Sequence, residues 1–224
     1  MLINFRNALM THVSDLPPGY VAVDYVRTTG NQFVDTGFYC TDRSQFKMDC
    51  AITGCGGSCG IFGARGVTES YGSGPQWLPY GSLGIFCNNN FYIALNDQNF
   101  DSGWLTSKPP VSGARRTIEI IDRSIYVDGS FYVKSSQTGS YECTVTTGLF
   151  NTHLKTGSNP YNWQYGSSRK VSMRFYGFSA TGGGANGRLA VDIVPVAKDG
   201  VGYLYERLSK TVLTTEGGGT LIVD

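Results

Sequence analysis

Apolar and polar residues alternate with a period of two along much of this chain, and no other feature of the sequence constrains the fold as strongly. In the segment Gln45–Thr53 every second side chain is apolar, beginning with Phe46 and ending with Ile52. The segment Val171–Phe178 begins in the same way. Successive side chains of a β-strand point to opposite faces, so each segment predicts a strand with one face in a core and the other in water.

Similar segments recur along the chain with turn residues between them. Strands are predicted over 83–87, 91–95, 116–122, 124–133 and 189–196, with roughly ten to thirteen in the whole chain. Asp128-Gly129 divides one of these segments into a hairpin, because a two-residue turn needs residues that tolerate positive φ. The sequence shows neither an internal repeat nor alternating strands and helices. We therefore expect an all-β, two-sheet antiparallel sandwich as one domain over residues 19–224.

The composition narrows the classes of partner. Charged residues make up 16% of the chain and hydrophobic residues 41%, which is typical of a globular protein. The formal net charge of +1 provides no positive surface for nucleic acid. The chain contains no apolar run of the roughly 20 residues that cross a bilayer. We expect neither nucleic-acid binding nor membrane insertion.

Residues 1–18 differ from the rest and predict a short amphipathic helix followed by a proline-rich linker. Apolar residues at helical spacing form one face, and Pro17-Pro18 ends any helix. The apolar residues of that face that we expect to dock on a partner are Leu2, Phe5, Leu9 and Val13. The face packs either on the chain's own sandwich or on a partner protein or symmetry mates, and packing on symmetry mates would make a homo-oligomer.

Six cysteines, at 40, 50, 55, 59, 87 and 143, permit disulfides that a chain of this length does not need for folding. Cys55 and Cys59 lie in a glycine-rich segment that suits a small disulfide or a metal. Their spacing differs from that of paired zinc ligands, so we favour thiols or one local disulfide.

One acidic segment suggests calcium. Asp97, Asn99 and Asp101 alternate like the first three ligands of a calcium loop. Lys108 occupies the position where such a loop has its bidentate acid. Ordinary Asx turns explain the same residues. We therefore expect that the protein needs no cofactor, and calcium is the one alternative that the sequence suggests.

Long irregular segments are predicted at 54–60, 65–82, 96–115, 135–148 and 152–169, and loops of this length are often functional. They carry the aromatic residues that are candidates for stacking on sugar rings, with amides nearby to bond hydroxyls. These glycan-binding candidates are Trp77, Tyr80, Trp104, Tyr161 and Trp163. The alternative is that the same rings fix the loops onto the sandwich.

Four segments resemble those of a known fold family. They are Tyr25–Gly37, Asp192–Pro195, Gly200–Tyr205 and Gly217–Thr220. They make residues 20–224 similar to the concanavalin A-like, laminin-G-like jelly-roll modules of bacterial surface and phage proteins. The resemblance implies a jelly roll of the lectin and glucanase superfamily. Such modules carry many binding roles, so the resemblance specifies a fold and not a ligand.

The glucanase branch of that superfamily implies a test for catalysis. It places acids on one strand as Glu-x-Asp-x-(x)-Glu, so that two carboxylates share a face. Here Glu119 and Asp122 are three residues apart, which a regular strand directs to opposite faces. His12 and His153 accompany no serine-nucleophile motif. We expect a non-catalytic protein, with a glycan hydrolase as the least favoured function.

The expected function is therefore that of a lectin-like phage virion protein, structural or for capsid decoration, which binds a partner or a host-surface glycan. The alternative is a bacterial cell-surface carbohydrate-binding module or adhesin, which would be extracellular. Asn4, Arg6 and Asn7 interrupt the apolar stretch that a secretory signal peptide would need. This favours the virion as the location.

Overall fold

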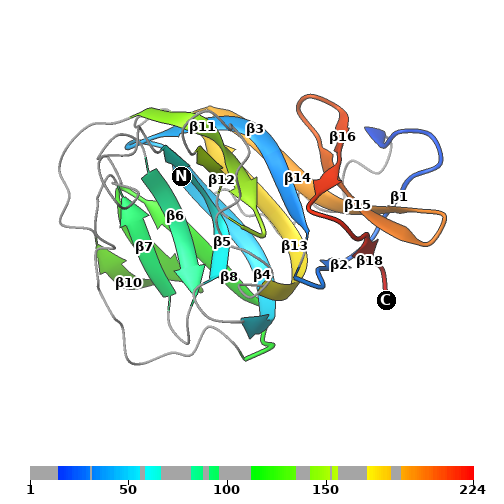
Figure 1. The fold of residues 1–224 in the computed structure, drawn as a ribbon, viewed down its shortest axis with the longest axis horizontal. Coiled ribbons are helices and arrows are strands. Elements are labelled where there is room, and N and C mark those ends of the chain that lie inside the picture. Colours follow the sequence, from blue (N-terminus) through cyan, green and yellow to red (C-terminus); the bar gives the residue numbers. More distant parts are fainter. Residues whose placement is uncertain are drawn as a thin grey trace, which may run out of the picture.

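The computed structural model of the chain describes residues 15–30, 32–55, 59–66, 82–87, 91–95, 112–134, 142–151, 153–155, 171–182 and 188–224. Within these ranges every regular element is a β-strand, and the strands form two sheets (Figure 1). The helix expected over residues 1–18, with its docking residues Leu2, Phe5, Leu9 and Val13, lies almost wholly outside the described residues. That prediction stays a prediction.

The large sheet has eleven strands. In spatial order they are β1 (Val21–Ala22), β14 (Leu189–Lys198), β15 (Val201–Glu206), β18 (Leu221–Ile222), β2 (Val26–Arg27), β13 (Val171–Thr181), β4 (Gln45–Cys55), β8 (Arg116–Ile121), β9 (Ser124–Val127) and β10 (Ser130–Lys134), with β16 (Thr211–Leu213) paired to β15. All its pairings are antiparallel, as the alternating sequence predicted.

The small sheet has seven strands. In spatial order they are β17 (Thr215–Glu216), β3 (Phe33–Thr41), β11 (Glu142–Leu149), β5 (Cys59–Gly66), β6 (Ser82–Cys87) and β7 (Phe91–Leu95), with β12 (His153–Lys155) beside β5. The β12–β5 pairing is parallel and the others are antiparallel. Strands β11 and β12 fall in segments 135–148 and 152–169, which we had expected to be irregular.

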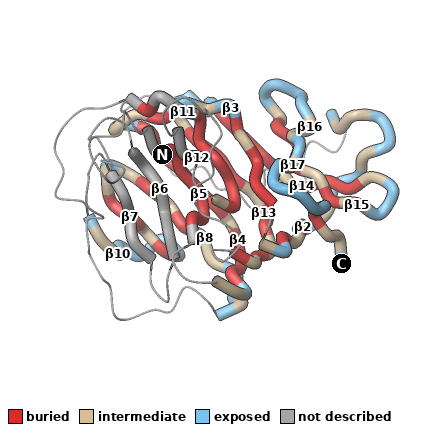
Figure 2. Tube along the Cα trace, in the orientation of Figure 1, coloured by how far each residue is buried: buried red, intermediate tan, exposed pale blue. Residues whose placement is uncertain are grey.

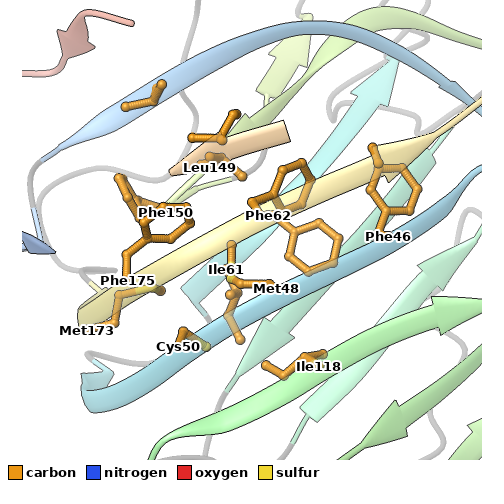
Figure 3. Packing of buried hydrophobic residues seen from close by; sticks show 14 of the residues in the cluster. Phe46, Met48, Cys50, Ile61, Phe62, Ile118, Leu149, Phe150, Met173 and Phe175 are labelled. Atoms are coloured by element: carbon orange, nitrogen blue, oxygen red, sulfur yellow. The ribbon is translucent and has the colours of Figure 1, made fainter. Parts of the chain in front are cut away.

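The two sheets enclose one hydrophobic core. Phe46 of β4 contacts Phe62 of the small sheet, with ring centroids 5.6 Å apart (Figure 3). Phe178 of β13 contacts the same ring with centroids 5.4 Å apart. The predicted inner positions Phe46, Met48, Cys50 and Ile52 are all at most 2% exposed. Buried segments run along β3, β4 and β13, where the sheets face each other (Figure 2). The alternation in β4 therefore predicted correctly which face is buried.

Strand β13 changes its partner half-way along. It pairs with β4 on one side, and on the other with β2 at Arg174 and Phe175 and then with β14 from Phe178 onward. The register against β4 shifts between Phe175 and Gly177, so Tyr176 is the extra residue of a β-bulge. This bulge lies where β2 and β14 diverge.

Strands β13, β14, β15, β18 and β2 form a closed ring of pairings, because β13 contacts both β14 and β2. Gly202 of β15 is needed where the ring is tightest. A Cβ atom there would lie 2.8 Å from Val26 Cγ1 and 3.1 Å from Leu221 Cβ. Val26 and Leu221 are at most 1% exposed, so neither has room to move away.

Two-residue turns join several of the strands. Asp128 and Gly129 have φ of 53° and 74°, which confirms the predicted hairpin turn. The prediction for the preceding strand was wrong at its end. Asp122 and Arg123 have φ of 47° and 62°, so β8 stops at Ile121 and a second tight hairpin follows.

Candidate functional site

One row of side chains crosses the outer face of the large sheet, which is the face opposite the core. Its members lie in register on six neighbouring strands, and on all of these except the edge strand the residues on either side of each member are buried in the core. The row, which we call the outer row, runs Asp192, Ser179, Lys47, Glu119, Tyr126 and Phe131. It combines charged, hydroxyl and aromatic groups on a surface that the backbone holds rigidly.

The aromatic end of the outer row lies on β9 and β10, and β10 is the edge strand of the sheet. Phe131 is 62% exposed and contacts Tyr126 edge to face, with ring centroids 5.9 Å apart. An exposed ring held by a neighbouring ring provides apolar area at low cost in conformational entropy. This pair is the part of the described surface best suited to stacking against a ligand.

Next to the aromatic pair, the centre of the outer row is an ion pair. Lys47 Nζ lies 2.9 Å from Glu119 Oε1. The Glu119 side chain keeps 13% of its surface exposed and that of Lys47 30%, so both groups remain within reach of a ligand. A fixed donor and a fixed acceptor beside an aromatic ring can bond hydroxyl groups on a stacked molecule.

A hollow of about 50 Å³ lies at the opposite end of the outer row, beside the β-bulge of β13 and the start of its pairing with β14. Gly177 and the backbone around Ile193 form part of its wall, and Lys47, Asp49, Asp192 and Arg207 also line it. The volume is sufficient for one or two waters or for one small substituent of a ligand. Because Gly177 has no side chain, the bulge leaves this space open.

Asp192 lines the hollow and is held by Arg207, whose Nε lies 2.8 Å from Asp192 Oδ2. Burial raises the pKa of Asp192 above its ordinary value, and the positive charge of Arg207 opposes that rise. The pair therefore depends on both partners, because Asp192 without Arg207 would be a carboxylate with little solvent around it.

Glu206 supports the same pair from the next strand. Burial alone would raise the pKa of Glu206, but hydrogen bonds from Ser209 and from the backbone N–H groups of Asp192 and Leu208 bring the pKa below its ordinary value. The N–H groups of Asp192 and Leu208 donate to Glu206 Oε1 over 2.9 and 3.2 Å. Glu206 is therefore an ionised hydrogen-bond acceptor that holds the backbone of β14 at Asp192.

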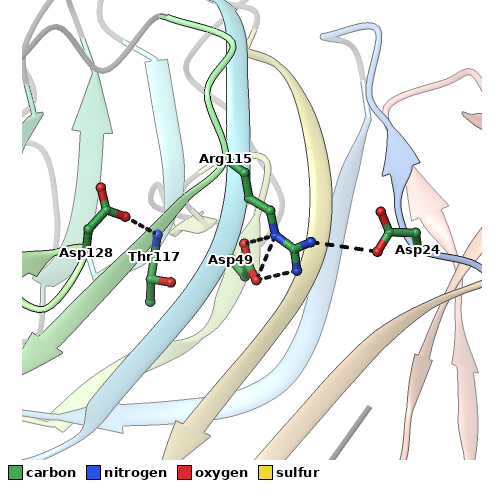
Figure 4. Close-up of polar contacts among 5 residues, drawn as sticks. All are labelled: Asp24, Asp49, Arg115, Thr117 and Asp128. Carbon is green, nitrogen blue, oxygen red and sulfur yellow. Dashed lines mark hydrogen bonds and ion pairs between the residues drawn. The ribbon is translucent and has the colours of Figure 1, made fainter. Parts of the chain in front are cut away.

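A second polar cluster borders the hollow and centres on Arg115 (Figure 4). Its guanidinium donates to both carboxylate oxygens of Asp49, with Nε 2.9 Å from Oδ1 and Nη2 2.7 Å from Oδ2. Nη1 lies 3.7 Å from Asp24. The hydrogen bond to Asp49 raises the pKa of Arg115, so this cation stays charged at any physiological pH.

Arg115 also covers the ring of Tyr176. The guanidinium carbon lies 3.8 Å from the ring centroid, and Tyr25 packs against the same ring with centroids 5.4 Å apart. Tyr176 consequently exposes only 7% of its surface. The bulge residue is therefore a support for the cluster and offers no free face to a ligand.

Asp128 ties the β9–β10 hairpin to β8. Its Oδ1 accepts a hydrogen bond from Thr117 N over 2.9 Å (Figure 4). Its Oδ2 lies 3.0 Å from Arg116 Nη1. Because this turn is anchored through its side chain, the position of Phe131 at the edge of the sheet is fixed.

The candidates that sequence analysis selected lie elsewhere. The aromatic candidates Trp77, Tyr80, Trp104, Tyr161 and Trp163 and the calcium candidates Asp97, Asn99 and Asp101 all fall outside the described residues. Among the residues that are described, no three His, Cys, Asp or Glu side chains gather as metal ligands would. In the same part of the chain, no helix has the length and apolar character needed to cross a membrane.

Sequence reasoning missed the aromatic end of the outer row, although a signal was present. A two-residue turn at Asp128-Gly129 necessarily pairs Tyr126 with Phe131 across the hairpin. The rest of the row could not be found in this way, because it depends on pairings between strands distant in sequence.

Comparison with protein-family models gives no match to this chain, and comparison with curated proteins gives none either. The geometry of the outer face is therefore the basis for the function considered next.

Proposed function

We propose that this chain is a non-catalytic jelly-roll binding protein, namely a phage virion structural or decoration protein that holds a host-surface glycan or another virion protein. The observation that carries the binding role is the outer row, in which Phe131 and Tyr126 adjoin the Lys47–Glu119 pair. The virion context rests on the resemblance of residues 20–224 to jelly-roll modules of phage and bacterial surface proteins.

The chemistry of the outer row favours a carbohydrate as the ligand. The C–H face of a sugar ring stacks on an exposed aromatic side chain, while its hydroxyls bond charged groups at the ring edge. The outer row provides both within four adjacent strands, and the hollow beyond Lys47 has room for one substituent.

The state of the carboxylates on this face supports binding of a glycan and argues against its hydrolysis. Asp49, Glu119 and Asp192 are each paired with a cation, at 2.7, 2.9 and 2.8 Å. A carboxylate engaged in this way serves as an acceptor of hydrogen bonds and is a poor proton donor in hydrolysis. Incubation of the protein with β-glucans should therefore leave the number of reducing ends unchanged, and release of sugar that Asp192→Asn abolishes would contradict this.

Binding can be tested with matched aromatic variants. On an array of bacterial surface oligosaccharides, Phe131→Ala should weaken binding by about tenfold. Tyr39→Ala is the control, because Tyr39 is 60% exposed but lies on β3 of the small sheet. Equal losses in both variants would contradict a site on the outer row. A loss confined to Trp77→Ala or Trp163→Ala would place the glycan site on the loops instead.

The virion role needs a separate test. Immunogold electron microscopy with antibodies to this chain should label phage particles; labelling of bacterial envelopes alone would favour the adhesin alternative. Deletion of residues 1–14 should leave the sandwich folded and abolish incorporation into particles. This deletion keeps Asp15, whose backbone oxygen accepts a hydrogen bond from Tyr205 Oη over 3.0 Å. A truncated chain that is still incorporated would overturn the docking role of the N-terminal segment.

A further inference from the structure

Two cysteines face each other in the core side of the small sheet. Cys40 of β3 and Cys143 of β11 place their Sγ atoms 3.0 Å apart, although they are separated by 103 positions in the chain. Both are buried, with exposed fractions of 0% and 5%. The neighbouring residues Thr41 and Glu142 are register partners on the antiparallel strands β3 and β11, and the register shifts between Glu142 and Thr146, next to Cys143.

We propose that Cys40 and Cys143 are a disulfide-forming pair that joins β3 to β11 when a small-molecule disulfide is present. In the first exchange, the thiolate of one cysteine attacks the small disulfide and releases one small thiol. The thiolate of the second cysteine then attacks the mixed disulfide and releases the other. Two protein thiols are oxidised and one small disulfide is reduced to two thiols, so atoms and electrons balance.

The geometry requires little movement. A disulfide needs the two Sγ atoms at about 2.05 Å, so the thiols must approach by only about 1 Å. Facing residues on antiparallel strands have Cβ atoms about 4.5–5.5 Å apart, and a disulfide needs about 3.5–4.5 Å. Closing the bond therefore takes rotation about the side-chain bonds together with an approach of the two strands by about 1 Å.

Burial decides when the reaction takes place. A thiol in an apolar core is a poor nucleophile and is shielded from reagents, so exchange takes place before β11 has packed against β3. After folding, the same burial protects the product from reductants. The disulfide is therefore a product of folding in the presence of an oxidant, such as refolding with a small-molecule disulfide.

A second pair of cysteines lies in the same sheet, so peptide mapping is needed to show which cysteines are joined. The backbone register also places Cys59 of β5 opposite Cys87 of β6. The other two cysteines, Cys50 and Cys55, lie on β4 of the large sheet. Cys50 is buried among core side chains and its thiol has a pKa raised by that burial, which makes it a suitable control.

The experiment is oxidative refolding of the full chain. The unfolded, reduced protein is refolded with either oxidised glutathione or dithiothreitol, its remaining thiols are alkylated, and peptides are mapped without reduction. We expect a Cys40–Cys143 peptide lighter by about 2 Da than the two thiol peptides, in the oxidised sample only. The loop closed by this bond is long, so the Tm of that sample should be higher by about 10 °C.

The variants separate this pair from the other cysteines. Cys50→Ala should keep the cross-linked peptide and the Tm difference between the two refolding conditions. Cys40→Ala combined with Cys143→Ala should lose the peptide and most of the Tm difference. Recovery of Cys40 and Cys143 as alkylated thiols from the oxidised wild type, or in bonds to other cysteines, would overturn the proposal. That result would leave the glycan-binding proposal untouched, because the outer row lies on the other sheet.

Discussion

At one end of the outer row Asp192 is mostly buried and held by Arg207, whereas at the other end Phe131 exposes 62% of its surface. The first end belongs to the closed ring of strands, and there Arg207 bonds the side chain of Asp192 while Glu206 accepts from its backbone N–H group. The second end is an edge hairpin whose aromatic pair contacts little else. Groups that satisfy each other maintain the fold, while apolar area left in water is available to a partner. We infer that stability resides in the ring and binding in the hairpin.

The largest expected effect comes from closing the space at Gly202. A Cβ atom there would lie 2.8 Å from Val26 Cγ1, so Gly202→Ala should lower the free energy of unfolding by about 2–3 kcal/mol. Gly177→Ala is the matched control, because its Cβ would lie 3.5 Å from Ile193 O in ordinary contact. Urea unfolding measures both. Equal stability of the two variants would contradict the role assigned to the ring.

A smaller loss should follow when Asp192 loses its cation. Arg207→Met keeps the aliphatic part of the side chain but leaves a mostly buried carboxylate unpaired, and we expect a loss of about 2 kcal/mol at pH 7. The loss should shrink near pH 4, because Asp192 can then bind a proton. A loss of the same size at both pH values would show that packing, and not charge, is responsible.

The fall in stability at acid pH should depend on protonation of Glu206. Its pKa in the folded protein lies below the unfolded value, so its contribution is present above the unfolded pKa and is lost as the pH falls through the folded pKa. Asp192, whose pKa is raised, acts in the opposite direction. Glu206→Gln should therefore flatten the fall in Tm below about pH 4.5. Thermal melts between pH 3 and 7 measure this, and an unchanged profile would contradict it.

The smallest effect on stability should come from the aromatic hairpin. Phe131→Ala removes a side chain that is mostly in water, so we expect a change of about 0.5 kcal/mol or less in the free energy of unfolding. Its effect on glycan binding should be far larger. A loss of stability comparable to that of Gly202→Ala would remove the distinction between the two ends.

Local patterns predicted the strands well and their partners poorly. The alternation in 45–53 predicted the core-facing side chains of β4 correctly, because a period of two depends only on the strand itself. It was wrong at Ala51, which the alternation directs away from the core but which is only 1% exposed. The hairpin at Asp122-Arg123 was missed, since that dipeptide lacks the glycine that signals a two-residue turn. Two adjacent bulky residues, Phe175 and Tyr176, interrupt the alternation in the sequence at the bulge. The change of partner from β2 to β14 beside the bulge depends on distant segments and has no local signal.

The candidate site shows the same limit. Tyr126 and Phe131 are paired by a local turn and could have been predicted. The Lys47–Glu119 pair requires β4 to pair with β8, and the hollow requires β13 to pair with β14. These pairings join distant segments, and no local pattern encodes them. The loop aromatics and the calcium candidates remain predictions from sequence.

The closed ring also has a consequence for how the chain reaches its native state. The pairing that completes it sets Ile222 opposite Arg27, and Asp224 bonds Arg27 across 197 positions of sequence. Such non-local closure has a high entropic cost and slows folding. During synthesis the early strands must wait for residues 221–224 to emerge, so a nascent chain stalled short of residue 221 should stay open at β2 and be unusually sensitive to proteases.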